Sequence, residues 1–334
     1  MESIQHTEVL LSSRDKLEQY PSHYQLKRNP INKVLIVGLG QLGLPVAKYV
    51  KERGFDVYGY DVSMNAMDRA ERIAGIKKAS PKLSDDSGTD AISDYDAYII
   101  IVSTHDPGNM SAPNIDGLLT LVNRISKDAK DGALVSIEST IPKGTSKKIF
   151  EMLNHRLHVV HAPHRWYALE EKYHGVNQLR VIGGVCDCCL KVGMQFYNDE
   201  RATSGSVISR RKRNKSLGIP LHPVLEVEIA EITKIAENAH RYLQIAFAED
   251  LYLYCQSNRI DFSELRKALN TKWNVNILEP REGIGGHCLP KDTKMFLDSS
   301  KNGRSKMLTA ALEVDSDYRA YLQSFRDLGM LSGK

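Results

Sequence analysis

The segment KVLIVGLGQLG, residues 33–43, decides the fold that this sequence predicts. It begins with the apolar run Val34–Val37, which stops at a glycine and is typical of a strand buried on both faces of a sheet. Helical character follows over Leu42–Arg53, and a second strand is expected at Asp56–Tyr60. A strand, a glycine-rich turn, a helix and a second strand begin a doubly wound α/β fold.

Short apolar runs recur after the second strand, and helical segments separate most of them. They lie at Ala97–Val102, Ala133–Ile137, Leu157–Val160 and Arg180–Ile182. Because strands alternate with helices, we expect a parallel sheet with right-handed crossovers, a Rossmann domain over residues 31–215. Residues 1–30 are polar and are interpreted as an N-terminal extension.

The pattern becomes helical after about residue 220. Pro223–Asn258 has helical periodicity and contains no internal glycine or proline, and shorter helices are expected at Phe262–Leu269 and Ser305–Phe325. We therefore expect residues 216–334 to form a helical domain built on one long central helix. A helix of this length suits a spine that joins two domains or two subunits.

Three glycines at GxGxxG spacing, Gly38, Gly40 and Gly43, stand between the first strand and the first helix. In this context one glycine permits the tight turn, one lets a pyrophosphate approach the backbone, and one lets helix and strand pack closely. The helix N-terminus favours the negative pyrophosphate. Asp61 ends the second strand, where a carboxylate binds ribose hydroxyls and repels a 2′-phosphate. These features predict NAD as cofactor, bound by Gly38, Gly40, Gln41, Leu42, Gly43 and Asp61.

Composition excludes several other classes of protein. A formal net charge of +4 is too small to indicate nucleic-acid binding, and no apolar run is long enough for a membrane span. The first 20 residues lack the apolar core of a secretion signal. Three of the five cysteines crowd into CDCC, residues 186–189, without a second ligand pair at zinc-like spacing, so no metal site is expected. Free thiols fit a reduced, cytoplasmic protein.

A second set of polar residues has the spacing of a reaction site. Lys234 and Asn238 are four residues apart on the long helix and project from one face, where together they can stabilise an oxyanion. Cys288 lies in GGHCLPKD, residues 285–292, at the predicted start of a helix with a lysine nearby. This position predicts a lowered thiol pKa and a reactive thiolate.

Five stretches together resemble the UDP-glucose/GDP-mannose (nucleotide-sugar) 6-dehydrogenase family. They are VST at 102–104, ESTIPKGT at 138–145, RVIGG at 180–184, the helix sequence at 228–255 and EPREGIGGHCLPKDT at 279–293. The stretches occur in the order that the family has. The resemblance implies a small-molecule substrate, a nucleotide sugar, and a homodimer formed through the long helix.

The resemblance also implies roles for individual residues. The family oxidises a sugar C6 alcohol twice and passes two hydrides to two NAD molecules. Cys288 would capture the aldehyde as a thiohemiacetal, whose oxidation gives a thioester that water cleaves to the uronic acid. Lys234 and Asn238 would hold the oxyanion, while Asp292 and Thr140 would orient water or transfer protons. Ser103, Thr104 and Glu138 would contribute to the cofactor site.

Two departures from the family pattern qualify these roles. In APHRW, residues 162–166, His164 stands where the family has a glutamate, so either His164 acts as the base, Glu170 or Glu171 replaces it, or thioester hydrolysis is impaired. The chain also ends at Lys334, too soon after Asp292 for the family's nucleotide-binding third domain. The basic run at 209–215 is one candidate for contacting a diphosphate; otherwise it is a solvated loop.

Two alternatives remain open from the sequence alone. A two-electron hydroxyacid dehydrogenase of the 6-phosphogluconate or 3-hydroxyisobutyrate type also has a Lys-x-x-x-Asn helix after a Rossmann domain. A protein that binds NAD without dehydrogenase activity would explain the missing glutamate and the missing domain. Dependence of turnover on Cys288 separates the first alternative from the nucleotide-sugar dehydrogenase.

Overall fold

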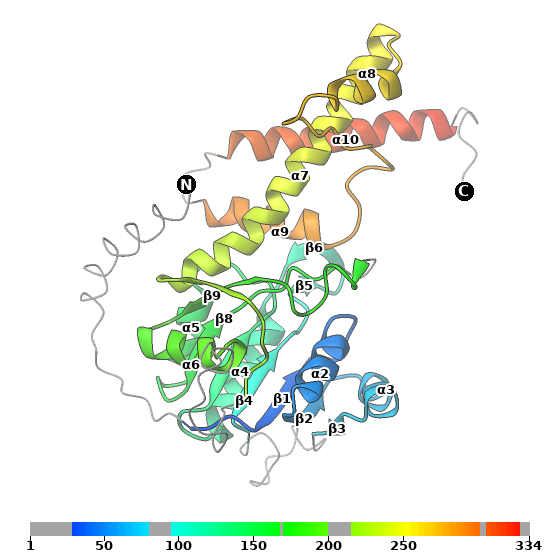
Figure 1. The fold of residues 1–334 in the computed structure, drawn as a ribbon. Helices are drawn as coiled ribbons and strands as arrows, with labels where there is room; N and C mark the ends of the chain where they lie inside the picture. Colours follow the sequence, from blue (N-terminus) through cyan, green and yellow to red (C-terminus); the bar gives the residue numbers. More distant parts are fainter. Residues whose placement is uncertain (1–28, 80–94, 168–169, 200–214, 301–304, 328–334) are drawn as a thin grey trace. The chain divides into compact units, whose positions relative to one another are not determined.

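The computed structural model describes residues 29–79, 95–167, 170–199, 215–300 and 305–327. The predicted N-terminal extension and most of the basic run at 209–215 therefore lie outside the described residues. The chain divides into two compact units (Figure 1). The first unit comprises the residues up to Thr104 and Ile115–Thr233, and the second unit comprises His105–Asn114 and the residues from Lys234 onward.

An eight-stranded sheet forms the centre of the first unit, with the strand order β10-β9-β8-β7-β4-β1-β2-β3. The strands are β1 (Lys33–Val37), β2 (Asp56–Tyr60), β3 (Lys77–Lys78), β4 (Ala97–Ile100), β7 (Leu134–Ile137), β8 (His158–His161), β9 (Arg180–Gly184) and β10 (Leu221–Val224). Every residue of β4, β7 and β8 is buried, including Ser136 of β7 and the two histidines that begin and end β8. The predicted doubly wound α/β class is confirmed.

One pair of strands departs from the predicted parallel sheet. Strands β8 and β9 are antiparallel, with Val160 opposite Gly184 and His161 opposite Gly183. A parallel pair needs a crossover, usually a helix, but the described residues between β8 and β9 contain no α-helix. The chain therefore returns beside β8 in the opposite direction, and β10 then pairs with β9 in parallel.

Five helices accompany this sheet among the described residues. They are α2 (Gly43–Glu52), α3 (Met64–Ala74), α4 (Asp116–Asp128), α5 (Thr145–Met152) and α6 (Asp187–Tyr197). Helix α2 packs against β1 and β2, whereas α6 packs against β8 and β9 (Figure 1). The turn before α2 is so tight that a Cβ atom on Gly43 would lie 1.8 Å from the Gly38 carbonyl oxygen. Only glycine therefore fits at position 43 without a backbone shift.

The second unit combines a small hairpin with helices. The hairpin consists of β5 (His105–Asp106) and β6 (Asn109–Pro113), and the helices are α8 (Phe262–Leu269), α9 (Cys288–Ser299) and α10 (Lys306–Asp327). The long helix α7 (Val227–Asn258) begins in the first unit and continues in the second. None of the described helices has the length and apolarity needed to cross a membrane.

The long helix begins later than its periodicity predicted. Leu221–Val224 forms the edge strand β10 and not the first turn of a helix, so the predicted start at Pro223 is wrong. Pro223 has no N–H to donate, and an edge strand tolerates this. Helix α8 has the predicted bounds, whereas the short strands β3, β5 and β6 were not predicted.

Candidate active site

The glycine-rich turn lies beside the end of β2, as the sequence predicted. Asp61 Oδ2 accepts a hydrogen bond of 2.7 Å from the Leu39 N–H, and Asp61 Oδ1 accepts one of 2.8 Å from the Ser63 N–H. The Gly38 N–H donates to the Tyr60 carbonyl at 2.8 Å. These bonds hold the Asp61 carboxylate against the turn that opens α2.

This turn fits the diphosphate of a dinucleotide. No atom lies within 4 Å of the position that a Cβ atom on Gly40 would occupy, so the backbone there can be approached closely. No side chain caps the N-terminus of α2, and its first turn has no acidic residue. The positive end of the α2 dipole therefore meets no negative side chain of its own first turn and favours an anion at this position. Gln41 is exposed and Leu42 is half-buried in this turn.

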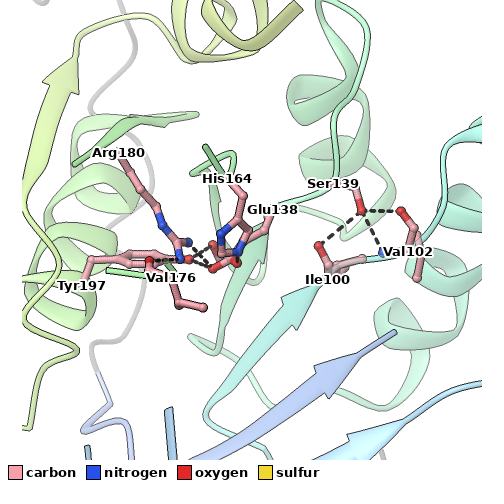
Figure 2. A network of polar contacts seen from close by, with 9 residues as sticks. Ile100, Val102, Glu138, Ser139, His164, Val176, Arg180 and Tyr197 are labelled. Carbon is pink, nitrogen blue, oxygen red and sulfur yellow. Dashed lines mark hydrogen bonds and ion pairs between the residues drawn. The ribbon is translucent and has the colours of Figure 1, made fainter. Parts of the chain in front are cut away.

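A buried carboxylate lies at the end of β7, which β4 separates from β1 in the sheet (Figure 2). Glu138 accepts hydrogen bonds from His164 Nε2 and from the Tyr197 hydroxyl, and its Oε1 lies 2.9 Å from Arg180 Nη1 in an ion pair. The Tyr197 hydroxyl is also hydrogen-bonded to the Ser136 hydroxyl at 2.7 Å. Glu138, His164 and Arg180 are 3%, 6% and 2% exposed, so water screens this charge cluster little.

Opposing effects set the pKa of Glu138. Burial alone would raise this pKa, but the positive charge of Arg180, the neighbouring His164 and the hydrogen bonds from His164 and Tyr197 lower it to about 2. Burial and the charge of Glu138 raise the pKa of Tyr197 well above its ordinary value. Glu138 is therefore an anion that can only accept hydrogen bonds, so the hydrogen in its bond to His164 must be on Nε2 of His164.

The loop after Glu138 is tied to the end of β4. The Ser139 hydroxyl donates to the Val102 carbonyl at 2.8 Å and accepts from the Val102 N–H at 2.8 Å (Figure 2). This contact fixes the VST and EST segments next to each other. Ser103 is exposed, Thr104 is buried and Thr140 is half-buried.

The second unit brings together the four predicted reaction residues of α7 and α9. Asn238 Nδ2 donates to Asp292 Oδ2 at 2.5 Å, and Asp292 Oδ1 pairs with Lys291 Nζ at 2.6 Å. Cys288 is exposed at the first residue of α9, where the charges of Asp292, Lys291 and Lys234 affect its thiol. The i,i+4 spacing of Lys234 and Asn238 accounts for their common face.

The predicted lowering of the Cys288 pKa is wrong for this structure. Partial withdrawal of the thiol from water raises its pKa, and Asp292 raises it further, whereas Lys291 and Lys234 lower it. The residue as a whole is exposed, so the desolvation concerns the sulfur atom and not the whole side chain. The helix N-terminus and the two lysines do not outweigh burial and the adjacent carboxylate.

Several residues of these clusters were not among the predicted site residues. Arg180 neutralises Glu138, Tyr197 donates a hydrogen bond to it, and Lys291 pairs with Asp292. The sequence carried only a weak signal for two of them: Arg180 is a charged residue at the start of the RVIGG strand, and Lys291 is the lysine of the PKD motif. Glu170 and Glu171, the alternatives to His164, are both exposed.

Comparison with known protein families identifies the chain. The NAD-binding domain of the UDP-glucose/GDP-mannose dehydrogenase family matches residues 32–200, and the central domain of that family matches residues 228–317. The chain belongs to the UDP-glucose/GDP-mannose dehydrogenase family. It is therefore an NAD-dependent dehydrogenase, and the predicted cofactor is confirmed.

Individual relatives agree with this family assignment. The UDP-N-acetyl-D-mannosamine dehydrogenase of Campylobacter jejuni is 30% identical over 314 residues, which cover 86% of this chain and 72% of that protein. The enzyme of the same name from Methanococcus maripaludis is 27% identical over 87% of this chain and 67% of its own length. The structure of a UDP-D-ManNAc dehydrogenase from Pyrococcus horikoshii has the same fold, with a TM-score of 0.70 at 24% identity over 89% of this chain and 72% of that one.

Membership of this family decides between the readings that the sequence left open. The chain spans about two thirds of the length of these relatives, and the two matched domains account for most of that overlap. Both matched domains belong to a family of nucleotide-sugar dehydrogenases, so the hydroxyacid dehydrogenase alternative is rejected. An NAD-binding protein without dehydrogenase activity is likewise excluded.

Two glycine substitutions are expected to separate folding from cofactor binding. Gly40→Ala places a methyl group in the open space that the diphosphate needs, so NAD affinity should fall at least about tenfold, roughly 1.4 kcal/mol, with an unchanged melting temperature. Gly43→Ala forces the Gly38 carbonyl away and should destabilise the fold by at least about 2 kcal/mol. Calorimetric NAD titration and thermal unfolding measure both effects. Unaltered NAD binding in a folded Gly40→Ala variant would contradict the cofactor site.

The lowered pKa of Glu138 predicts a specific loss of stability in acid. A carboxyl group whose pKa falls from 4.5 to about 2 on folding adds about 3 kcal/mol of stability above pH 4.5, and this is lost as the pH falls through about 2. Urea unfolding at several pH values should show this slope in the wild type. The slope should be shallower in Glu138→Gln and unchanged in the exposed control Glu170→Gln. Equal slopes in all three proteins would show that Glu138 is not the group responsible.

Proposed function

We propose that the chain oxidises the C6 alcohol of a UDP-linked sugar, UDP-N-acetyl-D-mannosamine, to the uronic acid through a thioester on Cys288. The cluster of Lys234, Asn238, Lys291 and Asp292 around Cys288 is the observation that carries this proposal. The names of the relatives supply the substrate class. Bound NAD supplies the acceptor for each hydride.

The first oxidation converts the alcohol to an aldehyde, which the sulfur of Cys288 attacks. The new carbon–sulfur bond turns the aldehyde oxygen into an oxyanion, which the Lys234 ammonium and the Asn238 amide stabilise. Asp292 accepts a hydrogen bond from the Asn238 amide and thereby fixes its orientation. A second hydride loss gives the thioester. One water then cleaves it, so that alcohol, water and two NAD give acid, two NADH and two protons.

The protonation state of Cys288 adds a constraint to this sequence. Because the thiol pKa is raised, only a minor fraction is thiolate at neutral pH, and the lysine charges oppose that rise. The proposed attack therefore becomes faster as the pH increases toward the thiol pKa.

We assign proton transfer during thioester hydrolysis to His164, in the position of the family glutamate. Its bond to the anionic Glu138 fixes the tautomer with the hydrogen on Nε2, so that Nδ1 is the ring nitrogen that accepts a proton. Arg180 and Tyr197 hold Glu138 in place and act only through it. The assignment of Thr140 to water orientation, of Ser103 and Thr104 to the cofactor, and the division into domains at residue 215 stay predictions.

Replacement of Cys288 should stop acid formation. With NAD and UDP-N-acetyl-D-mannosamine, wild-type protein quenched in acid should carry a uronyl adduct on the peptide that contains Cys288, detected by mass spectrometry. Cys288→Ser should lack the adduct and lose at least about 100-fold in acid formation, because serine is a far weaker nucleophile without an added base. Cys255→Ala is the matched control, since that buried thiol lies elsewhere in the second unit. Full acid formation by Cys288→Ser would overturn the thioester route.

We further propose that α7 forms the interface of a homodimer, which the exposed Phe247 and Tyr254 on this helix support. Light scattering should give twice the chain mass of 37.5 kDa. Phe247→Asp should shift the protein toward the monomer, whereas Ile73→Asp, an equally exposed apolar position on α3, should not. A wild-type monomer at working concentration would contradict this interface.

A further inference from the structure

We propose that His158, Cys186, Cys188 and Cys189 form a binding site for a thiophilic d¹⁰ cation, Zn²⁺, in the first unit. The site lies at the end of the sheet opposite to Glu138 and His164. His158 begins β8, whereas Glu138 and His164 follow the carboxyl ends of β7 and β8. The cluster therefore serves neither the cofactor nor the proposed thioester chemistry.

The antiparallel register of β8 and β9 brings the histidine to the cysteines. Val160 is opposite Gly184, and the Val185 N–H donates to the Val159 carbonyl at 3.1 Å. Continuing this register by one more residue places His158 opposite Cys186. Cys186 is also the N-cap of α6, so the first turn of that helix carries Cys188 and Cys189 to the same place.

The ligand atoms are close enough to share one cation. One ligand atom each from His158, Cys188 and Cys189 lies within 4.8 Å of the others. Cys186 Sγ lies 2.7 Å from Cys188 Sγ and 3.2 Å from Cys189 Sγ. Zinc bonds of about 2.3 Å to sulfur and 2.0–2.1 Å to nitrogen place tetrahedral ligands roughly 3.8 Å apart. Cys186 lies outside that group of three, so the four-ligand site that we propose requires the Cys186 side chain to rotate toward His158.

Hydrogen-bond donors surround the three sulfur atoms. The Cys186 sulfur is hydrogen-bonded to the sulfur atoms of Cys188 and Cys189, none of the three is in a disulfide, and a bound cation would take the place of the shared protons. Backbone N–H groups point to two of them: the Val159 N–H lies 3.4 Å from Cys189 Sγ and the Cys189 N–H 3.3 Å from Cys186 Sγ. Such donors and a helix N-terminus favour the net negative charge of a Cys₃His zinc site.

The burial of the four side chains excludes water from part of the site and leaves one side open for a cation to enter. His158 and Cys189 are fully buried, whereas Cys186 and Cys188 are half-buried. A cation can therefore enter from the side of the two half-buried thiols. Once bound, it would connect the start of β8 to the first turn of α6 and stabilise that end of the sheet.

Cobalt titration of the full chain tests this proposal. The experiment uses reduced, chelator-treated protein that carries Cys288→Ser, because the exposed Cys288 thiol is a competing ligand. One equivalent of Co²⁺ should produce thiolate-to-cobalt charge-transfer absorption and the visible bands of tetrahedral Co²⁺, and Zn²⁺ should abolish both. Zn²⁺ should also protect three thiols from alkylation and raise the melting temperature.

Matched variants in the same background make the assignment specific. Cys186→Ser and Cys188→Ser change half-buried positions, and each should weaken Co²⁺ binding at least about tenfold with circular dichroism unchanged. Cys255→Ala should bind Co²⁺ as its parent does. The proposal is overturned if the parent shows no thiolate-to-cobalt absorption, if the double variant Cys186→Ser/Cys188→Ser keeps it, or if the three thiols react equally fast with and without Zn²⁺.

Discussion

A negative charge buried at the end of β7 requires an ion-pair partner and hydrogen-bond donors from several other elements, and the first unit is arranged around this requirement. Arg180 comes from β9, Tyr197 from α6 and His164 from the segment after β8. An unpaired carboxylate there would cost several kcal/mol, so these elements must be in place together. The antiparallel turn of β9 is what brings Arg180 to the carboxylate, and the same turn carries CDCC back to the start of β8.

The fold could be predicted where one residue pattern has one physical meaning. The run before Gly38 and the tight contact between Gly43 and the Gly38 carbonyl oxygen are local, and the strand, turn and helix that they predict are present. The predictions failed where pairing with a distant strand overrides local periodicity. Pro223 and Val224 belong to the predicted helical pattern, yet they pair with β9 as part of an edge strand. The direction of β9 likewise depends on its neighbour and not on its own residues.

In the site too, features fixed by local sequence spacing could be predicted, and features that depend on distant residues could not. Lys234 and Asn238 share a helix face by spacing, whereas the hydrogen bond from Asn238 to Asp292 joins two helices and could not be predicted from either motif. The lowered Cys288 pKa was wrong because helix position and nearby lysines are visible in the sequence, whereas desolvation and the orientation of the Asp292 carboxylate are not. Arg180 and Tyr197 were missed because their role exists only through Glu138. His158 joins the three cysteines through strand register, which linear ligand spacing does not contain.

The central claim is that a chain with His164 in place of the family glutamate still completes a four-electron oxidation. The most direct test counts NADH formed per UDP-N-acetyl-D-mannosamine consumed by the wild-type protein, with identification of the sugar product. We predict two NADH per sugar and a uronic acid as the only product. An aldehyde product with one NADH per sugar, or a thioester that stays on Cys288 after two NADH in a single turnover, would contradict this proposal and show that His164 does not replace the glutamate in thioester hydrolysis.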